Sequence, residues 1–477
     1  MMTPVICDDA DARQAIKDDL DTTLVVEAAA GTGKTTELVN RILRVLATGR
    51  AKMIEIVAVT FTEKAAGELK LRLRAALEHA RATADGDERP RLELALATLE
   101  EARVNTIHGF CAELLRERPV EASVDPLFVV LTEPEADRLY TRAFRAWLQE
   151  ALTDPPEGVR RALRRSSFGG DADGPIDRLR NAGRMLAEWR DFPRSWTRPA
   201  FDRGATIDRL VQALHQLADL TSRASSDRDN LFVDTDGVRR LSRQIQLEQS
   251  VEPPAPGSGE SRRSSVASRT GQSGQTDLDG WEARLIDLTR DRGFSRTRKG
   301  SGYKFAKDVT RTEVLAARDA LFADLQQFRK DADADLAAAL QQELRGATER
   351  YQQLKQAAGA LDFADLLVRA RDLIRDDADV RRHLRQKFTR IFVDEFQDTD
   401  PIQAEILELL ADNVPGKLFI VGDPKQAIYR FRGTDVGTYW DVRDRLEASG
   451  GRVLHLTTSY RSVPEIQHFV NAAFTKR

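Results

Sequence analysis

Eight consecutive residues near the N-terminus have the types and spacing of a phosphate-binding loop. They follow the apolar run Leu24-Val25-Val26 and precede apolar residues at helical spacing. Glycines in such a loop let backbone N–H groups close around a phosphate, and the helix that follows points its positive end at it. Lys34 is expected to reach the β- and γ-phosphates, and Thr35 is expected to offer its hydroxyl to Mg²⁺. The residues expected to contact the nucleotide are Ala28, Ala29, Ala30, Gly31, Thr32, Gly33, Lys34, Thr35 and Thr36.

A pair of carboxylates far along the chain has the chemistry that a bound nucleoside triphosphate needs. Asp394 and Glu395 directly follow the apolar run 391–393. Asp394 can hold Mg²⁺ opposite Thr35, and Glu395 can orient and deprotonate an attacking water. Ala28 stands where the strict loop pattern has glycine, so an ordinary strand–turn–helix is the alternative for the loop by itself. The loop and the carboxylates together favour ATP hydrolysis.

Three further polar residues are expected to join this set. Gln397 and Gln426 can hydrogen-bond the γ-phosphate or the attacking water. Arg461 can neutralise charge that develops on the γ-phosphate. Ligands of open α/β sheets bind at the carboxyl ends of the strands, and each of these residues follows an apolar run.

Six short apolar runs are expected to form the sheet that positions these residues. They alternate with helical patterns, which indicates a parallel α/β sheet. The expected fold is an α/β P-loop NTPase (RecA-like) domain that is interrupted by a large, mainly helical insertion. The runs are 24–26, 56–59, a short one around 104, 390–393, 417–421 and 452–456.

The order of these patterns predicts the domain organisation. We expect residues 1–131 to form the first part of the ATPase domain and 132–385 to form the helical insertion. We expect 386–477 to form the rest of the ATPase domain and the start of a second motor domain. Residues 252–277 are rich in Pro, Gly and Ser, which predicts a disordered linker. The basic stretch 292–299 lies near aromatic residues and could grip nucleic acid, although a solvated charged face is more common.

The composition narrows the class of protein. Of the 477 residues, 41% are hydrophobic and 31% are charged, which is typical of a soluble globular protein. No apolar run is long enough to span a membrane, and two cysteines suit a reducing cytoplasm. The six histidines have no metal-ligand spacing. The net charge is −3, so any DNA contact must come from a local basic surface.

Seven motifs, in this order, resemble those of the UvrD/RecB-type superfamily 1 helicases, and within them the RecB/AddA-like branch. They lie at both ends of the chain, and the middle matches only as a long helical insertion. The motifs are AAAGTGKT (28–35), VTFTEKAAGEL (59–69), NTIHGF (105–110), LDFADLL (361–367), FVDEFQDTDPIQ (392–403), IVGDPKQAIYRFRG (420–433) and TTSYRS (457–462).

The resemblance implies a DNA-dependent ATPase that moves 3′ to 5′ along single-stranded DNA, unwinds duplex DNA, and serves DNA repair and recombination. It implies that Lys34, Glu395, Gln426 and Arg461 act in catalysis and that Tyr460 stacks on adenine. It implies ATP and Mg²⁺ as cofactors, with Thr35 and Asp394 as metal ligands. The residues that match positions lining the DNA are Phe61, Thr106, His108 and Tyr429. A plain core role is the alternative for Phe61, His108 and Tyr429.

Three departures from the family pattern limit this expectation. Ala12 stands where relatives often have a glutamine that reads adenine, and Gln14 is a poor substitute. Thr36 stands where many relatives have an arginine near the base. The motifs of the second motor domain and of a nuclease domain are not found up to Arg477, so we expect them on a missing C-terminal part or a partner subunit. The alternative is a truncated fragment or a non-enzymatic module that binds ATP and DNA.

Overall fold

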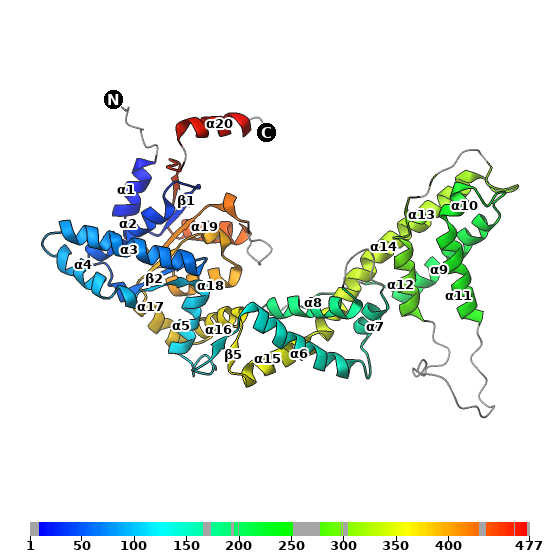
Figure 1. The fold of residues 1–477 in the computed structure, drawn as a ribbon, viewed down its shortest axis with the longest axis horizontal. Helices are drawn as coiled ribbons and strands as arrows, with labels where there is room; N and C mark the ends of the chain where they lie inside the picture. Colours follow the sequence, from blue (N-terminus) through cyan, green and yellow to red (C-terminus); the bar gives the residue numbers. More distant parts are fainter. Residues whose placement is uncertain are drawn as a thin grey trace. The chain divides into compact units, whose positions relative to one another are not determined.

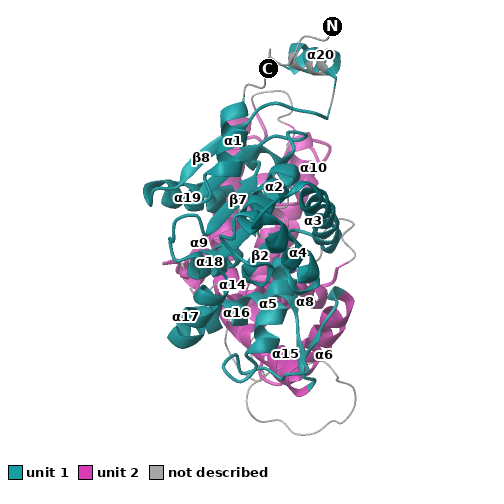
Figure 2. Ribbon diagram, turned by 90° about the vertical axis from the view of Figure 1, so that its left-hand side faces the viewer, with its two compact units in different colours: residues 1–133, 358–477 teal, residues 134–357 magenta. Residues whose placement is uncertain are grey.

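The computed structural model describes residues 9–165, 173–191, 195–198, 200–250, 277–296, 298, 304–428, 436–461 and 463–474. The chain forms two compact units, one made of residues 1–133 with 358–477 and the other of 134–357 (Figure 2). The first unit is therefore built from both ends of the sequence. Residues 358–385, expected from the sequence to belong to the insertion, pack in the first unit instead.

A six-stranded parallel sheet is the centre of the first unit (Figure 1). Its strand order is β3-β2-β6-β7-β1-β8, so the C-terminal strands β6 and β7 lie between the N-terminal strands β2 and β1. The α/β P-loop fold class expected from the sequence is confirmed, with all six strands at the expected runs. The strands are β1 (Leu24–Ala28), β2 (Ile56–Thr60), β3 (Arg103–Thr106), β6 (Arg390–Val393), β7 (Leu418–Gly422) and β8 (Arg452–Leu456).

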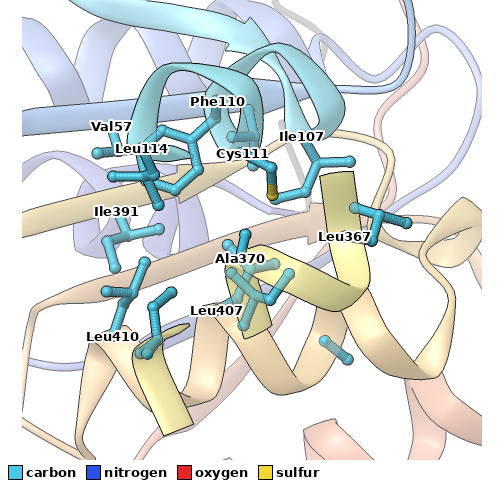
Figure 3. Packing of buried hydrophobic residues seen from close by; sticks show 14 of the residues in the cluster. Val57, Ile107, Phe110, Cys111, Leu114, Leu367, Ala370, Ile391, Leu407 and Leu410 are labelled. Atoms are coloured by element: carbon cyan, nitrogen blue, oxygen red, sulfur yellow. The ribbon is translucent and has the colours of Figure 1, made fainter. Parts of the chain in front are cut away.

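Successive strand residues point to opposite faces of this sheet, and both faces are buried. Along β2, Val57 and Val59 join one hydrophobic cluster, while Ile56 and Ala58 join another. Because a parallel sheet needs cover on both faces, its strands are apolar throughout rather than alternating with polar residues. The first cluster is packed by helices α5, α16, α17, α18 and α19, and Figure 3 shows part of it. The second cluster is packed by α1, α2, α3 and α4.

The remaining elements of the first unit connect and cover the strands. The helices are α1 (Ala10–Asp18), α2 (Lys34–Ala47), α3 (Glu63–Thr83), α4 (Glu88–Ala97), α5 (Ile107–Glu117), α16 (Phe363–Asp376), α17 (Ala378–Lys387), α18 (Pro401–Ala411), α19 (Val436–Ala448) and α20 (Pro464–Phe474). Short 3₁₀ turns are η1 (Met53–Glu55), η2 (Leu99–Glu101), η3 (Phe396–Asp398) and η4 (Pro424–Gln426). A separate two-stranded parallel pair consists of β4 (Val129–Val130) and β5 (Ala360–Leu361).

The second unit is helical in its described part, as expected for the insertion. The 33-residue helix α14 contributes to both of its hydrophobic clusters, with Leu325 buried in one and the partly buried Leu340 packed against the other. None of the described helices is long and apolar enough to cross a membrane. The helices are α6 (Glu133–Ala151), α7 (Glu157–Arg164), α8 (Pro175–Glu188), α9 (Arg203–Ser222), α10 (Asn230–Asp234), α11 (Asp236–Ser250), α12 (Leu278–Leu288), α13 (Arg292–Ser295), α14 (Arg311–Glu343) and α15 (Arg345–Ala357).

In the described part of the basic stretch near residue 295, the aromatic side chains are buried, and Tyr303 lies outside the described residues. Phe294 and Phe305, which could have stacked on bases, are buried in a hydrophobic cluster of the second unit. Arg298 pairs with both carboxylate oxygens of Asp234. The proposed linker 252–277 lies almost entirely outside the described residues.

Candidate active site

The loop after β1 has the backbone conformation that a phosphate-binding loop requires. Gly31 and Gly33 have φ values of +81° and +86°, in the left-handed region that favours glycine. A Cβ on Gly31 would also overlap the side chains of Ser459 and Arg461. Thr32 is fully buried and its hydroxyl donates to the Ala29 carbonyl at 2.8 Å. The loop is therefore closed by its own contacts and leads straight into α2 at Lys34.

The phosphate-binding loop contacts the carboxylates at the end of β6, although the two segments lie some 360 residues apart in the sequence. Lys34 Nζ lies 2.8 Å from Glu395 Oε2. Thr35 Oγ1 lies 3.5 Å from Asp394 Oδ2. Four residues that the sequence predicts for ATP hydrolysis are thus brought together by the adjacent strands β1, β7 and β6. Lys34 is largely buried, while about a third of the Glu395 side chain is exposed.

Burial shapes the electrostatics of Asp394. Desolvation and the neighbouring charge of Glu395 raise the pKa of Asp394 to about 6, against the lowering effect of Lys34. The Asp394 carboxylate and the Thr35 hydroxyl are hard oxygen donors of the kind that Mg²⁺ prefers. A cation bound here would offset the cost of burying this negative charge. The donor set therefore fits the magnesium ion expected from the sequence.

Replacing Asp394 by asparagine is expected to stabilise the fold at neutral pH. The carboxyl has a folded pKa of about 6, above the value near 3.9 of an unfolded chain. The folded state therefore keeps its proton while the unfolded state loses it, and stability falls as pH rises from about 4 to 6. In buffer without nucleotide or divalent cation, Asp394→Asn should raise the free energy of unfolding at pH 7.5 by about 1–3 kcal/mol.

Urea unfolding at two pH values measures this effect. The gain should shrink to a few tenths of a kcal/mol at pH 4, where the wild-type carboxyl is already neutral. Equal gains at both pH values would contradict the assignment of the effect to ionisation of Asp394.

Glu395 has an unusual backbone conformation. Its φ is +54°, a left-handed value that is uncommon for residues other than glycine and costs on the order of 1–3 kcal/mol. Its backbone N–H donates to Asp394 Oδ1 at 3.0 Å. This turn lets two adjacent residues present their carboxylates to different partners, Asp394 to Thr35 and Glu395 to Lys34.

The two glutamines have different neighbours. Gln397 is buried; its amide nitrogen donates to Glu395 Oε2 at 2.7 Å and its amide oxygen accepts from the Asp423 N–H at 2.8 Å. Gln397 therefore joins the ends of β6 and β7 beside the catalytic carboxylate. Gln426 instead donates to Asp423 Oδ2 at 2.6 Å. Each amide nitrogen carries two N–H donors and uses one of them in these contacts, so both glutamines keep a donor for a γ-phosphate.

The segment after β8 lies against the loop. The Tyr460 N–H donates to the Gly31 carbonyl at 2.8 Å, and the residue is 65% exposed. Arg461 follows directly and is exposed. The structure thus places both residues, as expected, at the loop. Ala29, Ala30 and Thr36 are also exposed there.

Three of the four expected DNA-lining residues are described, and each has protein neighbours. Thr106 is buried at the start of α5, where its hydroxyl donates to Glu63 Oε1 at 2.7 Å and accepts from the Gly109 N–H. Burial lowers the pKa of His108 to about 4, so its ring is neutral at pH 7. It packs edge-on against Phe363, with the ring centroids 5.3 Å apart. Tyr429 lies outside the described residues.

Phe61 lines a pocket beside the carboxylates. Its lining includes Phe61, Asp394, Glu395 and Asp398. Burial and the charge of Glu395 raise the pKa of Asp398 to about 6. Asp398 was not predicted as a site residue, although it lies three residues after Glu395. Phe61 is therefore next to the expected hydrolytic site rather than remote from it.

Comparison with known proteins identifies the family to which this chain belongs. Residues 9–447 match the model of the UvrD/REP helicase N-terminal domain. The chain belongs to this family. The resemblance drawn from the seven motifs is thereby confirmed. The match runs through the helical unit, which is therefore part of the family's domain.

Two longer proteins are similar to this chain over most of its length. A protein of Pediococcus pentosaceus, named as the A subunit of an ATP-dependent helicase/nuclease, is 26% identical over 95% of this chain and 38% of its own length. The protein of the same name from Levilactobacillus brevis is 28% identical over 94% of this chain and 37% of its own length. The chain thus spans less than two fifths of the length of the curated relatives it matches.

Proposed function

We propose that the chain is the N-terminal motor portion of an ATP-dependent DNA helicase and translocase that acts in DNA repair and recombination. One observation carries the proposal: the phosphate-loop residues Lys34 and Thr35 contact the two carboxylates at the end of β6. A strand–turn–helix without catalytic purpose has no need of this pairing. Membership of the UvrD/REP helicase N-terminal domain family supports it.

Each residue of the site has a role in the proposed hydrolysis. Backbone N–H groups of residues 31–35 and the Lys34 ammonium bind the phosphates. Thr35 and Asp394 would hold Mg²⁺, which neutralises phosphate charge when bound. Glu395 accepts a proton from the attacking water, and Gln397 holds the Glu395 carboxylate in place. Arg461 would contact the γ-phosphate.

The substrate, direction and partners are further parts of the proposal. We propose movement from 3′ to 5′ along single-stranded DNA, with Phe61, Thr106, His108 and Tyr429 on the DNA track. The relatives are named as subunits of a helicase and nuclease, and they are much longer than this chain. We therefore propose a second motor domain and a nuclease domain outside the matched region, together with a partner subunit.

Hydrolysis of ATP by the 477-residue chain, with and without single-stranded DNA, tests the proposal. We expect DNA to raise the steady-state rate and Glu395→Gln to remove the increase. The absolute rate is expected to be low, because an arginine supplied from another domain is typically worth about 10³–10⁵ in rate. Binding of ATP and DNA without turnover would support the binding-module alternative. Failure to bind ATP would contradict both.

A further inference from the structure

The segment after β8 packs directly on the phosphate-binding loop. The Tyr460 N–H donates to the Gly31 carbonyl at 2.8 Å. A Cβ added to Gly31 would overlap the Arg461 Cβ, so the Arg461 side chain begins against the loop. The position of residues 457–461 therefore decides where the Arg461 guanidinium can reach.

Asp9, which precedes α1, holds the start of this segment. Its Oδ2 accepts from the N–H groups of Thr457 and Thr458 at 2.8 and 3.0 Å. The Asp9 side chain is only 1% exposed. A buried carboxylate is costly unless its oxygens have donors, and backbone N–H groups make strong hydrogen bonds to it. The first residues after β8 are thus bonded to a side chain that lies 448 residues earlier in the sequence.

Arg13 supplies further donors to Asp9 and also bonds the phosphate loop. Its Nε lies 2.9 Å from Asp9 Oδ1, and its Nη2 lies 3.0 Å from Asp9 Oδ2. Nη2 also donates to the Thr32 carbonyl at 3.0 Å, and Nη1 donates to Glu37 Oε1 at 2.9 Å. The guanidinium can serve all of these acceptors at once because its donors form a planar fork. Asp9, Arg13 and Glu37, here called the α1 clamp, therefore join α1, the phosphate loop and α2 to the segment after β8.

The α1 clamp is a cluster of nearly buried charges. The Arg13 side chain is 12% exposed and the Glu37 side chain is 7% exposed. Moving such charges out of water is costly, and their attraction offsets the cost only where the geometry is good. The cluster therefore favours one relative position of the parts that it joins. Those parts carry Lys34 on one side and Arg461 on the other, the two cations expected at the γ-phosphate.

From this geometry we propose that Asp9 and Arg13 are positioning residues that hold Arg461 where its guanidinium meets the γ-phosphate. This role rests on the proposed nucleotide site and on the contact proposed there between Arg461 and the γ-phosphate. The α- and β-phosphates have other expected donors, which are the backbone N–H groups of the loop and Lys34. Weakening the α1 clamp should therefore reduce the preference of the site for ATP over ADP and affect ADP binding much less.

Equilibrium binding of ADP and of a non-hydrolysable ATP analogue to the 477-residue chain measures this preference as the ratio of the two dissociation constants. Arg461→Ala should lower the ratio by about 10- to 150-fold, the factor expected for loss of a hydrogen bond to a charged group. Arg13→Lys keeps the positive charge but cannot serve every acceptor, so it should lower the ratio by at least about threefold. Asp9→Asn removes the negative charge and one acceptor oxygen, and it should lower the ratio in the same way.

Circular dichroism shows whether each variant is folded before its affinities are compared, and the two variants test the α1 clamp independently. The matched control Gln14→Ala changes an exposed residue of the same helix and should leave both dissociation constants unchanged.

A double-variant cycle tests whether Arg13 acts through Arg461. Residues that act on one contact have non-additive effects, so Arg13→Lys should change the ratio by less than about twofold in the Arg461→Ala background. Equal effects of Arg13→Lys in the wild-type and Arg461→Ala backgrounds would overturn the positioning role.

Failure of this inference can be told apart from failure of the proposed function. Unchanged ratios in folded Arg13→Lys and Asp9→Asn would overturn the inference while the nucleotide site stands. Equal losses of affinity for ADP and the ATP analogue would also overturn it, because they would show that the α1 clamp only supports the loop. No binding of either nucleotide to the wild-type chain, or a ratio unaffected by Arg461→Ala, would contradict the proposed nucleotide site itself.

Discussion

Replacing Glu395 by glutamine is expected to lower kcat for DNA-stimulated ATP hydrolysis by about 10²–10⁴, the usual contribution of a general base. Glutamine has nearly the same shape but cannot accept the proton of the attacking water. The carboxylate also pairs with Lys34 Nζ at 2.8 Å, and its negative charge lies next to the place where the phosphates are expected to bind. ATP should therefore bind Glu395→Gln as tightly as wild type or more tightly.

Separate measurement of ATP affinity and single-turnover hydrolysis distinguishes these two effects. Glu405→Gln is the matched control, because Glu405 lies on α18 and contacts Arg371 and Arg375 only at 3.9 Å. That variant should hydrolyse ATP like wild type. If Glu395→Gln kept kcat within about threefold of wild type, Glu395 would not be the base, since general-base loss costs far more.

The sheet was predictable because its signal is local and repeated. Each strand is a short apolar run bounded by turn residues, and both of its faces are buried, as Val57 and Ala58 illustrate. The order of the strands was not predictable from such runs. β6 and β7 lie between β2 and β1, so the chain returns from the helical unit 134–357 to complete the middle of the sheet.

The boundary of the helical insertion was harder to place because helical periodicity does not say what a helix packs on. Residues 311–375 have one continuous helical pattern, yet the structure interrupts it with β5 and starts α16 at Phe363. Leu366, Leu367 and Ala370 of α16 then pack in the hydrophobic cluster of the sheet. Figure 3 labels Leu367 and Ala370 among them. The strand that pairs with β5 is β4, which precedes the helical unit in the sequence, whereas β5 follows it. No local sequence pattern reveals this pairing.

The identity of the main site residues was predictable from the sequence, but their contacts with one another were not. Residue types identified Lys34, Thr35, Asp394 and Glu395, and the structure brings all four together. The contact of Gln397 with Glu395, and the left-handed backbone of Glu395, depend on the turn after β6. The Asp9–Arg13 pair has i,i+4 spacing, which signals a helix pair, but its contacts with the loop and with Thr457 come only from the fold.

Replacing Arg161 by alanine is expected to destabilise the helical unit by about 3 kcal/mol, at the lower end of the cost of breaking a buried ion pair. The Arg161 side chain is fully buried on α7. It lies 3.1 Å from Glu282 of α12 and 2.6 Å from Asp335 of α14. Both carboxylates are also nearly buried, so removing the guanidinium leaves negative charge poorly compensated and opens a cavity.

Neighbouring arginines explain why the loss of stability should stay near the lower end of the cost of breaking a buried ion pair. Arg165 still pairs with Glu282, and Arg198 still pairs with Asp335. Urea unfolding followed by tryptophan fluorescence measures the change, since four of the five tryptophans lie in residues 134–357. Arg164→Ala on the same helix is the control, because its side chain is 61% exposed and should cost at most about 0.5 kcal/mol. Equal effects of the two variants would contradict a special role of the buried Arg161 in the stability of this unit.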